Sequence, residues 1–196
     1  MNPTTPFWFV VAFLFGALPL SYWLGRVALH VDIRDYGDGN PGATNVFKAG
    51  GGAWGMTAIL LDGFKGAIPL WLAMGIGGIS GWDLTAVALA PILGHCYTPF
   101  LRFQGGKAIT VSFGVWLALT TWLGPVTLGL ALTLWVLILK VEAWAITLGM
   151  LTLLAVLLFT HAAPWLLGVW LGNFLILVWR HRHEFRRPRS APPTQA

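Results

Sequence analysis

The sequence predicts an all-α membrane protein with seven transmembrane helices. Of its 196 residues, 57% are hydrophobic and only 10% are charged, whereas soluble domains carry about 25% charged residues. So little charge cannot cover a surface that faces water, and lipid must therefore surround most of the chain. Twelve Trp and twelve Phe residues fit this environment, because aromatic rings are enriched near the lipid headgroups.

Seven apolar segments follow one another along the chain. A spanning helix needs roughly 20 apolar residues, and somewhat fewer when it tilts or packs within a bundle. The segments cover residues 7–25, 53–79, 84–97, 109–123, 125–140, 143–160 and 164–179. The third to fifth are short, so one pair of them can instead form a re-entrant structure.

The first segment is predicted to be a transmembrane helix rather than a secretory signal. No positively charged region precedes it, and further apolar segments follow it to the end of the chain. No internal repeat and no separate soluble region is visible. We therefore expect one polytopic membrane domain over residues 1–187, followed by a Pro-rich, disordered cytoplasmic tail over residues 188–196.

The basic residues predict the orientation. When the N-terminus is placed outside, every Lys and Arg except Lys65 falls in loops 26–52, 98–108 and 140–142 or in the tail from residue 180. The loops on the other side carry one charged residue, Asp83. Because cytoplasmic loops are rich in Lys and Arg, we expect an outside N-terminus and a cytoplasmic C-terminus. The basic composition then reflects topology, and no nucleic-acid partner is expected.

The first cytoplasmic loop is rich in glycine and polar residues. Gly37, Gly39 and Gly42 fall within six residues, and glycines at such spacing can turn successive backbone N–H groups toward one point, forming an anion-binding concavity. The side-chain donors beside them are Asn40, Thr44 and Asn45. A tight solvated turn is the alternative, but a Gly/Asn/Thr loop between two membrane helices favours ligand binding.

The second cytoplasmic loop ends in Gly105, Gly106 and Lys107, directly before an apolar segment. Exposed amides, a point charge and the positive end of the following helix dipole together suit a phosphate group. A plain positively charged membrane anchor explains the same three residues. This loop is therefore a second candidate phosphate site.

Two further groups of polar residues lie in or next to the apolar segments. Asp62 and Lys65 are three residues apart, so they can pair on one helical face. Ionisable residues at membrane depth are functional candidates, and a structural pair that locks the bundle is the equal alternative. After the last segment, His181 or His183 can approach a substrate, whereas the arginines of residues 180–187 resemble a basic flank attracted to anionic lipid.

The single cysteine, Cys96, excludes an intrachain disulfide, and the histidines lack a convincing set of metal ligands, so no metal site is expected.

Four motifs in the same order resemble the PlsY family, the bacterial acyl-phosphate:glycerol-3-phosphate acyltransferases. The family motif GSGNxGATN corresponds to residues 37–45 (GDGNPGATN), and LDxxKG corresponds to residues 61–66 (LDGFKG). The motif GHxFPxFLxFKGGKG corresponds to residues 94–108 (GHCYTPFLRFQGGKA), with a one-residue shift about the proline, and HRxNI corresponds to residues 181–185 (HRHEF). The resemblance covers nearly the whole chain, from Pro19 to about Arg187.

The resemblance implies a small seven-helix enzyme of the bacterial inner membrane. The family transfers an acyl chain from acyl-phosphate to the 1-hydroxyl of glycerol 3-phosphate, which gives lysophosphatidate and phosphate. Because acyl-phosphate is already activated, no covalent nucleophile and no cofactor is implied. Orientation of the substrates and stabilisation of charge in the transition state can supply most of the rate.

The resemblance also implies a role for each matching residue. The loop from Gly37 to Gly42 would bind acyl-phosphate, Lys48 and Lys107 would neutralise phosphate, and His181 would bind glycerol phosphate or help to move its proton. The predicted catalytic residues are His181, Lys107 and Lys48. The predicted substrate-binding residues are Gly37, Asp38, Gly39, Asn40, Gly42, Thr44, Asn45, Asp62, Lys65, His95, Gly105 and Gly106.

Four positions depart from the family pattern. Asp38 replaces serine, Glu184 replaces asparagine, Lys48 replaces arginine and Ala108 replaces glycine. A carboxylate beside a phosphate is repelled, by roughly 4 kcal/mol for two unit charges about 4 Å apart at an effective dielectric near 20. Lysine keeps the charge of arginine but loses its bidentate fork. We therefore expect weaker phosphate binding than the family pattern would provide.

Two readings remain open at this point. The chain is either a working acyltransferase with a shifted site, in which Asp38 points away, is protonated or pairs with a cation, or a paralogue that binds a phospholipid or another phosphorylated ligand without this chemistry. A small-solute transporter is less supported, because the charged residues gather at one interface instead of crossing the midplane in broken helices.

Overall fold

The computed structural model describes residues 2–139 and 141–185, and within these ranges every regular element is helical. The tail that the sequence predicts to be disordered, residues 188–196, lies outside the described residues. The α-helices are α1 (Thr5–Ala17), α2 (Leu20–Ala28), α3 (Ala43–Gly50), α4 (Gly52–Gly75), α5 (Gly81–Cys96), α6 (Ile109–Thr120), α7 (Leu123–Ile138), α8 (Glu142–Phe159) and α9 (Pro164–Arg180). Two 3-10 turns, η1 (Ile33–Asp35) and η2 (Pro99–Leu101), lie in the loops.

Each of the seven predicted segments contains a helix, but only four described segments are long and apolar enough to cross a membrane by themselves. These are Thr5–Ala28, Gly52–Gly75, Gly81–Leu101 and Glu142–Phe159. Helices α6, α7 and α9 are apolar but shorter than 18 residues. The structure therefore supports a multi-pass helical membrane protein.

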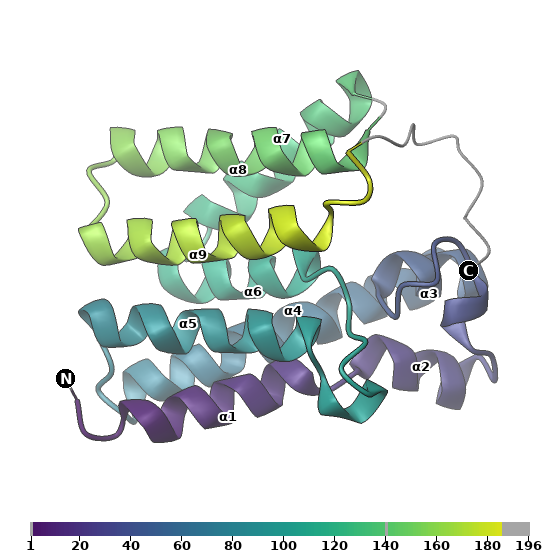
Figure 1. The fold of residues 1–196 in the computed structure, drawn as a ribbon, viewed down its shortest axis with the longest axis horizontal. Coiled ribbons are helices and arrows are strands. Elements are labelled where there is room, and N and C mark those ends of the chain that lie inside the picture. The colour runs from purple at the N-terminus through teal and green to yellow at the C-terminus, as the bar shows by residue number, and fades with distance from the viewer. Residues whose placement is uncertain (1, 140, 186–196) are drawn as a thin grey trace.

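The helices form two layers (Figure 1). In this view α1, α5, α9 and α8 lie side by side in front, and α4, α6 and α7 lie behind them. Small residues allow helices to approach one another closely, as is common between membrane helices. Gly114 of α6 lies against the backbone of Gly63 in α4, and Gly94 of α5 lies against the backbone of Phe13 in α1.

A hydrophobic core and a buried polar network join the second half of the bundle. Val111, Trp116, Leu153 and other buried residues of helices α4 to α9 form the main core. Within it, the indole Nε1 of Trp116 donates to Asn173 Oδ1 at 3.0 Å, and Asn173 Nδ2 donates to Ser112 Oγ at 2.8 Å. Since lipid offers polar groups no partner, these bonds hold α6 to α9.

The predicted first segment, residues 7–25, lies within the candidate span Thr5–Ala28, but its helix is interrupted at Leu18–Pro19 and forms α1 and α2. Proline has no N–H to continue the helical ladder, and the last carbonyls of α1 are left without helical partners. Thr98 Oγ1 donates to the Ala17 carbonyl at 2.5 Å, and Lys65 Nζ donates to the Leu18 carbonyl at 2.7 Å. The break is thus closed by side chains from α4 and from the α5–α6 loop.

The predicted pairing of Asp62 with Lys65 is confirmed. The two side chains are each 2% exposed, and Lys65 Nζ lies 2.8 Å from Asp62 Oδ1. Asp62 Oδ2 also accepts from Ser21 Oγ of α2 at 2.5 Å. Together with the bond from Lys65 to the Leu18 carbonyl, the pair locks α4 to both sides of the break.

Replacing Lys65 with methionine should therefore destabilise the fold by about 3–5 kcal/mol, the usual effect of removing one partner of a buried ion pair. The substitution leaves the Asp62 carboxylate buried without its cation and removes the donor of the Leu18 carbonyl. The thermal midpoint in detergent, followed by tryptophan fluorescence, measures the loss. The double variant Asp62→Leu/Lys65→Met should lose less than Lys65→Met alone; an equal or larger loss would show that the charge pair is not the cause.

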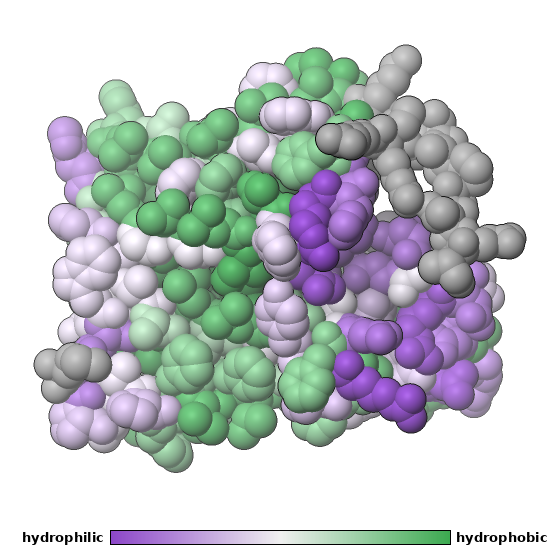
Figure 2. Space-filling model, in the orientation of Figure 1, coloured by the Kyte–Doolittle hydropathy of each residue, from purple (hydrophilic) through white to green (hydrophobic). Residues whose placement is uncertain are grey.

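The charged surface gathers at one end of the bundle, as the sequence predicts. Figure 2 shows hydrophobic residues over the middle of this face, and hydrophilic residues at the end where α3 and the end of α9 lie in Figure 1. Helix α3 at this end was not predicted, because its eight residues lie within a polar loop. Val46 of α3 is fully buried against Ile33 and Ala58, which fixes the loop on the bundle.

Candidate functional site

The first glycine loop is folded around Asp38. Its neighbours Gly37 and Gly39 both have left-handed backbones, with φ of 60° and 74°, a conformation that glycine adopts at little cost. Asp38 Oδ1 accepts from the Asn40 N–H at 3.1 Å and from Asn45 Nδ2 at 3.1 Å. Asn45 Nδ2 also donates to the Asn40 carbonyl at 2.8 Å. Asp38 therefore shapes the loop as well as charging it.

Lys48 of α3 reaches back to the same loop. A Cβ added at Gly37 would lie 2.5 Å from Lys48 Nζ and still closer to Asn45 Oδ1, so only glycine leaves room for both side chains. Asn45 is 1% exposed, and its Oδ1 has no hydrogen-bond partner among the described residues. Gly42 similarly leaves room for Asn40 Nδ2, which would lie 2.8 Å from an added Cβ.

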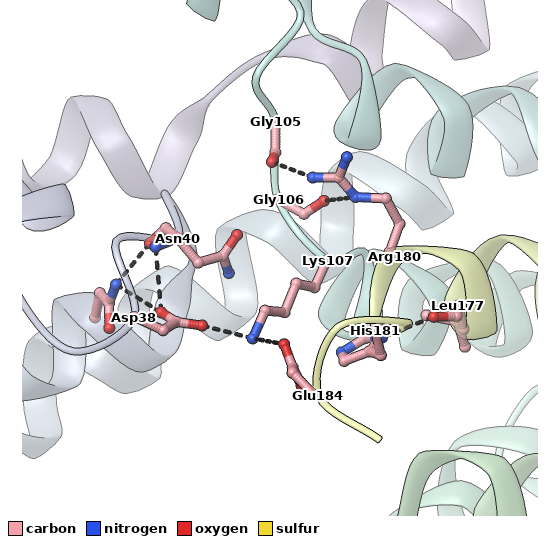
Figure 3. A network of polar contacts seen from close by, with 10 residues as sticks. Asp38, Asn40, Gly105, Gly106, Lys107, Leu177, Arg180, His181 and Glu184 are labelled. Carbon is pink, nitrogen blue, oxygen red and sulfur yellow. Dashed lines mark hydrogen bonds and ion pairs between the residues drawn. The ribbon is translucent and has the colours of Figure 1, made fainter. Parts of the chain in front are cut away.

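Lys107 bridges two carboxylates from distant parts of the chain (Figure 3). Its Nζ lies 2.5 Å from Asp38 Oδ2 in the glycine loop and 2.5 Å from Glu184 Oε1 in the turn after α9. Both residues are the acidic departures from the family pattern. The structure thus selects one of the alternatives for Asp38, since its carboxylate pairs with a cation.

The electrostatics of this bridge favour the charged forms of Asp38 and Lys107. Burial by itself raises the pKa of Asp38, but the Lys107 ammonium and the donors of Asn40 and Asn45 outweigh it and hold that pKa below its ordinary value. Burial by itself lowers the pKa of Lys107, and the two carboxylates reverse this and raise it above its ordinary value. Asp38 and Lys107 are therefore expected to be charged at neutral pH.

Gly105 and Gly106 precede Lys107 and are held by Arg180, the last residue of α9. Arg180 Nη2 donates to the Gly105 carbonyl at 2.7 Å, and its Nε donates to the Gly106 carbonyl at 3.1 Å. Buried His95 lies under this segment, because a Cβ added at Gly106 would meet its Nε2. His95 thus packs against the second candidate phosphate site.

Ala108, which stands where the family has glycine, has a left-handed backbone with φ of 66°. Non-glycine residues adopt this conformation at a cost of roughly 1–2 kcal/mol. The glycine of the family motif therefore suits this backbone better, and Ala108 introduces local backbone strain next to Lys107.

His181 is fully buried in the turn that follows α9. Its Nδ1 lies 2.8 Å from the Leu177 carbonyl. A carbonyl can only accept, so Nδ1 carries the hydrogen, and in the neutral ring Nε2 is then an acceptor. Burial lowers the pKa of His181, although the Leu177 carbonyl and Glu184 oppose that shift. Nε2 is buried and has no hydrogen-bond partner within the described ranges.

The predicted site residues are thus only partly brought together. Hydrogen bonds, ion pairs and close contacts join the glycine loop, with Asn40, Asn45 and Lys48, to Lys107 through Asp38, and join Lys107 to the turn of His181 through Glu184. Asp62 and Lys65 instead pair around the α1–α2 break, as described above. Thr44 and His183 are exposed.

Arg180 was missed as part of this site, and its interpretation as a lipid-facing flank was wrong, because its guanidinium points into the protein. A basic residue at the end of a membrane helix looks the same in sequence in both roles. Within the described part of the chain, no group of three His, Cys, Asp or Glu residues is placed to hold a metal ion.

Comparison with known proteins gives one consistent family. The glycerol-3-phosphate acyltransferase family model matches residues 6–191. The chain is 34% identical to glycerol-3-phosphate acyltransferase 1 of Thermotoga maritima, over 92% of this chain and 96% of the relative. It is 38% identical to the glycerol-3-phosphate acyltransferase of Geobacter sulfurreducens, over 92% and 91% of the two chains.

The fold agrees with a solved member of the same family. The crystal structure of PlsY, an integral membrane glycerol 3-phosphate acyltransferase, in its glycerol 3-phosphate form superposes with a TM-score of 0.84. The two chains are 29% identical, and the match covers 94% of this chain and 91% of the other. With four motifs in order, a matching fold and close relatives over nearly its full length, the chain belongs to the glycerol-3-phosphate acyltransferase family.

Proposed function

We propose that this protein transfers a fatty acyl group from acyl-phosphate to the 1-hydroxyl of glycerol 3-phosphate at the cytoplasmic face of a bacterial inner membrane. The observation that carries the proposal is the convergence of the glycine loop, Lys107 and the His181 turn through one bridged ammonium. Acyl transfer between two phosphorylated substrates needs cations beside a group that can accept a proton. This end of the bundle holds both.

The seven-span topology, with the N-terminus outside and the C-terminus in the cytoplasm, is part of this proposal. The basic residues of the cytoplasmic loops support it through the positive-inside rule. The single membrane domain over residues 1–187 is supported by helices that pack continuously, from α1 on α5 to α8 on α9. Membrane lipid is the expected surroundings, and no nucleic-acid partner is proposed.

The bridge leaves Lys107 able to bind phosphate. An ammonium group has three N–H donors, and the two carboxylates occupy two of them. The third can contact a phosphate oxygen, while Lys48 at Gly37 supplies a second cation to the glycine loop. We propose that the loop and Lys48 hold acyl-phosphate and that Lys107 lies between the two substrates.

His181 is proposed to accept the proton of the glycerol hydroxyl rather than to bind the phosphate. A neutral Nε2 presents a lone pair, which suits an O–H donor and repels a phosphate oxygen. In the reaction the hydroxyl oxygen forms a bond to the acyl carbonyl carbon as its proton passes to Nε2. The bond from that carbon to the phosphate oxygen then breaks, and the phosphate departs with the electron pair and takes up the proton.

The direct test is to incubate purified protein with palmitoyl-phosphate and glycerol 3-phosphate and to measure released phosphate and lysophosphatidate. Release that depends on glycerol 3-phosphate is the expected result. No turnover above a boiled control would contradict the proposal and would favour a paralogue that only binds a phosphorylated ligand.

Replacing Asp38 with asparagine should lower the KM for acyl-phosphate about 5-fold, with kcat little changed. Asparagine keeps an oxygen for the Asn40 and Asn45 donors but removes a negative charge near the anionic substrates, and for a half-exposed carboxylate this repulsion is worth about 1 kcal/mol after screening. Exposed Asp35, in the same loop, is the control, and Asp35→Asn should leave KM unchanged. A higher KM in Asp38→Asn would show that the carboxylate assists binding.

A further inference from the structure

Two links fasten the residues around His181 to the segment that carries Lys107. Directly before His181 in the chain, Arg180 donates to the Gly105 and Gly106 carbonyls at 2.7 and 3.1 Å. Three residues after His181, Glu184 Oε1 lies 2.5 Å from Lys107 Nζ. Three consecutive residues, 105 to 107, therefore take part in both links, and His181 lies between Arg180 and Glu184 in the chain (Figure 3).

The turn between these links is itself closed by a backbone bond. The Glu184 N–H donates to the His181 carbonyl at 2.9 Å, and the His181 N–H donates to the Leu177 carbonyl at 3.0 Å. Helix α9 packs mainly against α5 and α8 in the described ranges. Among the described residues, the hydrogen bonds of Arg180 and the ion pair of Glu184 join its C-terminal turn to the glycine–lysine segment.

Arg182 has a different environment, although it is only two residues away. It is exposed, lies in the turn directly after α9, donates to the Trp179 carbonyl of α9 at 2.8 Å, and lies over the Trp179 ring at 4.3 Å. Arg180 instead lies over the ring of Tyr97 at 5.6 Å and bonds outside its helix. A lipid-facing flank would give the two arginines similar surroundings, and the structure does not.

We propose that Arg180 and Glu184 are positioning residues that together fix Nε2 of His181 relative to Lys107. This inference rests on the proposed function, in which Nε2 accepts the proton of the acceptor hydroxyl. The planar guanidinium of Arg180 binds two carbonyls in one orientation, which a lysine ammonium cannot reproduce. Glu184 adds a second link, so loss of both frees the turn more than the sum of the single losses.

The test compares Arg180→Lys with Arg182→Lys in the full-length protein. Both changes keep the charge, but only Arg180→Lys removes a guanidinium that donates to two carbonyls of another segment. Arg180→Lys should lower kcat/KM about 10- to 100-fold, mainly through kcat, because displacement of a reacting group by about 1 Å has effects of this size. Arg182→Lys should stay within about 2-fold of wild type, since the contacts of Arg182 are with Trp179, three residues before it in the chain.

Two further readouts separate positioning from general stability. In Arg180→Lys, weaker confinement of His181 should move the acidic limb of the pH profile of kcat/KM upward, because burial is what lowers the pKa of that ring; Arg182→Lys should not move it. Glu184→Gln combined with Arg180→Lys should reduce kcat by more than the product of the single effects. Thermal midpoints in the same detergent show the folded fraction of each variant.

The outcomes distinguish this inference from the function on which it rests. Absence of turnover in the wild-type protein contradicts the proposed function. Turnover in the wild type with equal kcat in Arg180→Lys and Arg182→Lys contradicts the positioning role alone. A loss in Arg180→Lys that follows the fall in folded protein, with an unchanged pH profile, also overturns it.

Discussion

Replacing Lys107 with methionine is expected to lower kcat/KM by about 10²- to 10³-fold, the loss seen when a preorganised charge-stabilising donor is removed from an active site. Methionine has similar length but no charge. It removes the proposed phosphate contact and leaves the carboxylates of Asp38 and Glu184 without their shared cation. Two unit charges about 4 Å apart repel by roughly 4 kcal/mol at an effective dielectric near 20, so the substitution also makes the site repel anionic substrates.

The measurement is steady-state release of phosphate, with KM determined separately for each substrate. Arg102→Met is the matched control, because Arg102 is an exposed basic residue of the same loop and no substrate role is proposed for it. Its activity should stay near that of the wild type. Retention of kcat/KM in Lys107→Met would remove this lysine from the proposed mechanism and leave its bridge as a structural feature.

The further removal of carboxylates provides an internal check on the same argument. In the triple variant Asp38→Asn/Lys107→Met/Glu184→Gln, no carboxylate of the bridge is left unpaired. If repulsion accounts for part of the loss, this variant should recover part of the KM but not of the kcat. An unchanged KM would show that the whole loss comes from the missing ammonium.

Replacing His181 with asparagine is expected to lower kcat by about 10²- to 10⁴-fold, the usual contribution of a general base, while the KM for glycerol 3-phosphate changes little. The asparagine amide can still donate to the Leu177 carbonyl, as Nδ1 does in the structure, so the turn should remain folded. It provides no group that takes up a proton near neutral pH. The difference between kcat and KM thus tests whether His181 moves a proton or binds the phosphate.

The pH profile gives a second measure of His181. Burial holds its pKa below the ordinary value of 6.5, and only the neutral ring can accept a proton. Activity should therefore be retained as pH falls to 6.5 and be lost at lower pH, when the folded protein finally protonates the ring. Exposed His183 is the control, and His183→Asn should leave both kcat and this limb unchanged. An increased KM with normal kcat in His181→Asn would place the ring at the phosphate instead.

Much of the fold and part of the site could be predicted from local sequence. The apolar segments, the Asp62–Lys65 pair and the family itself were predicted from it, because hydrophobic length, helical spacing and motif order are all properties of short stretches. The broken first helix was missed even though Pro19 is visible in the sequence. A proline can kink a membrane helix or end it, and the outcome depends on partners such as Lys65 and Thr98 that close the free carbonyls.

Within the site, Asp38 and Glu184 also look different in the sequence and in the tertiary structure. In sequence, Asp38 and Glu184 are two negative charges placed where a phosphate site would have none. In the structure they come from opposite ends of the chain to one ammonium, and Lys107 compensates both. Arg180 was likewise interpreted as a lipid-facing residue from its position at the end of a membrane helix, whereas its side chain donates to the carbonyls of Gly105 and Gly106.

The sequence by itself determined that this protein is a helical membrane protein of the glycerol-3-phosphate acyltransferase family with its charge on one side, because composition and motifs suffice for that. Only the tertiary structure decided which charges neutralise one another and which nitrogen of His181 carries the hydrogen. Those properties depend on distances between residues far apart in the chain, since an ion pair or hydrogen bond is set by a few ångströms in space and not by separation in sequence.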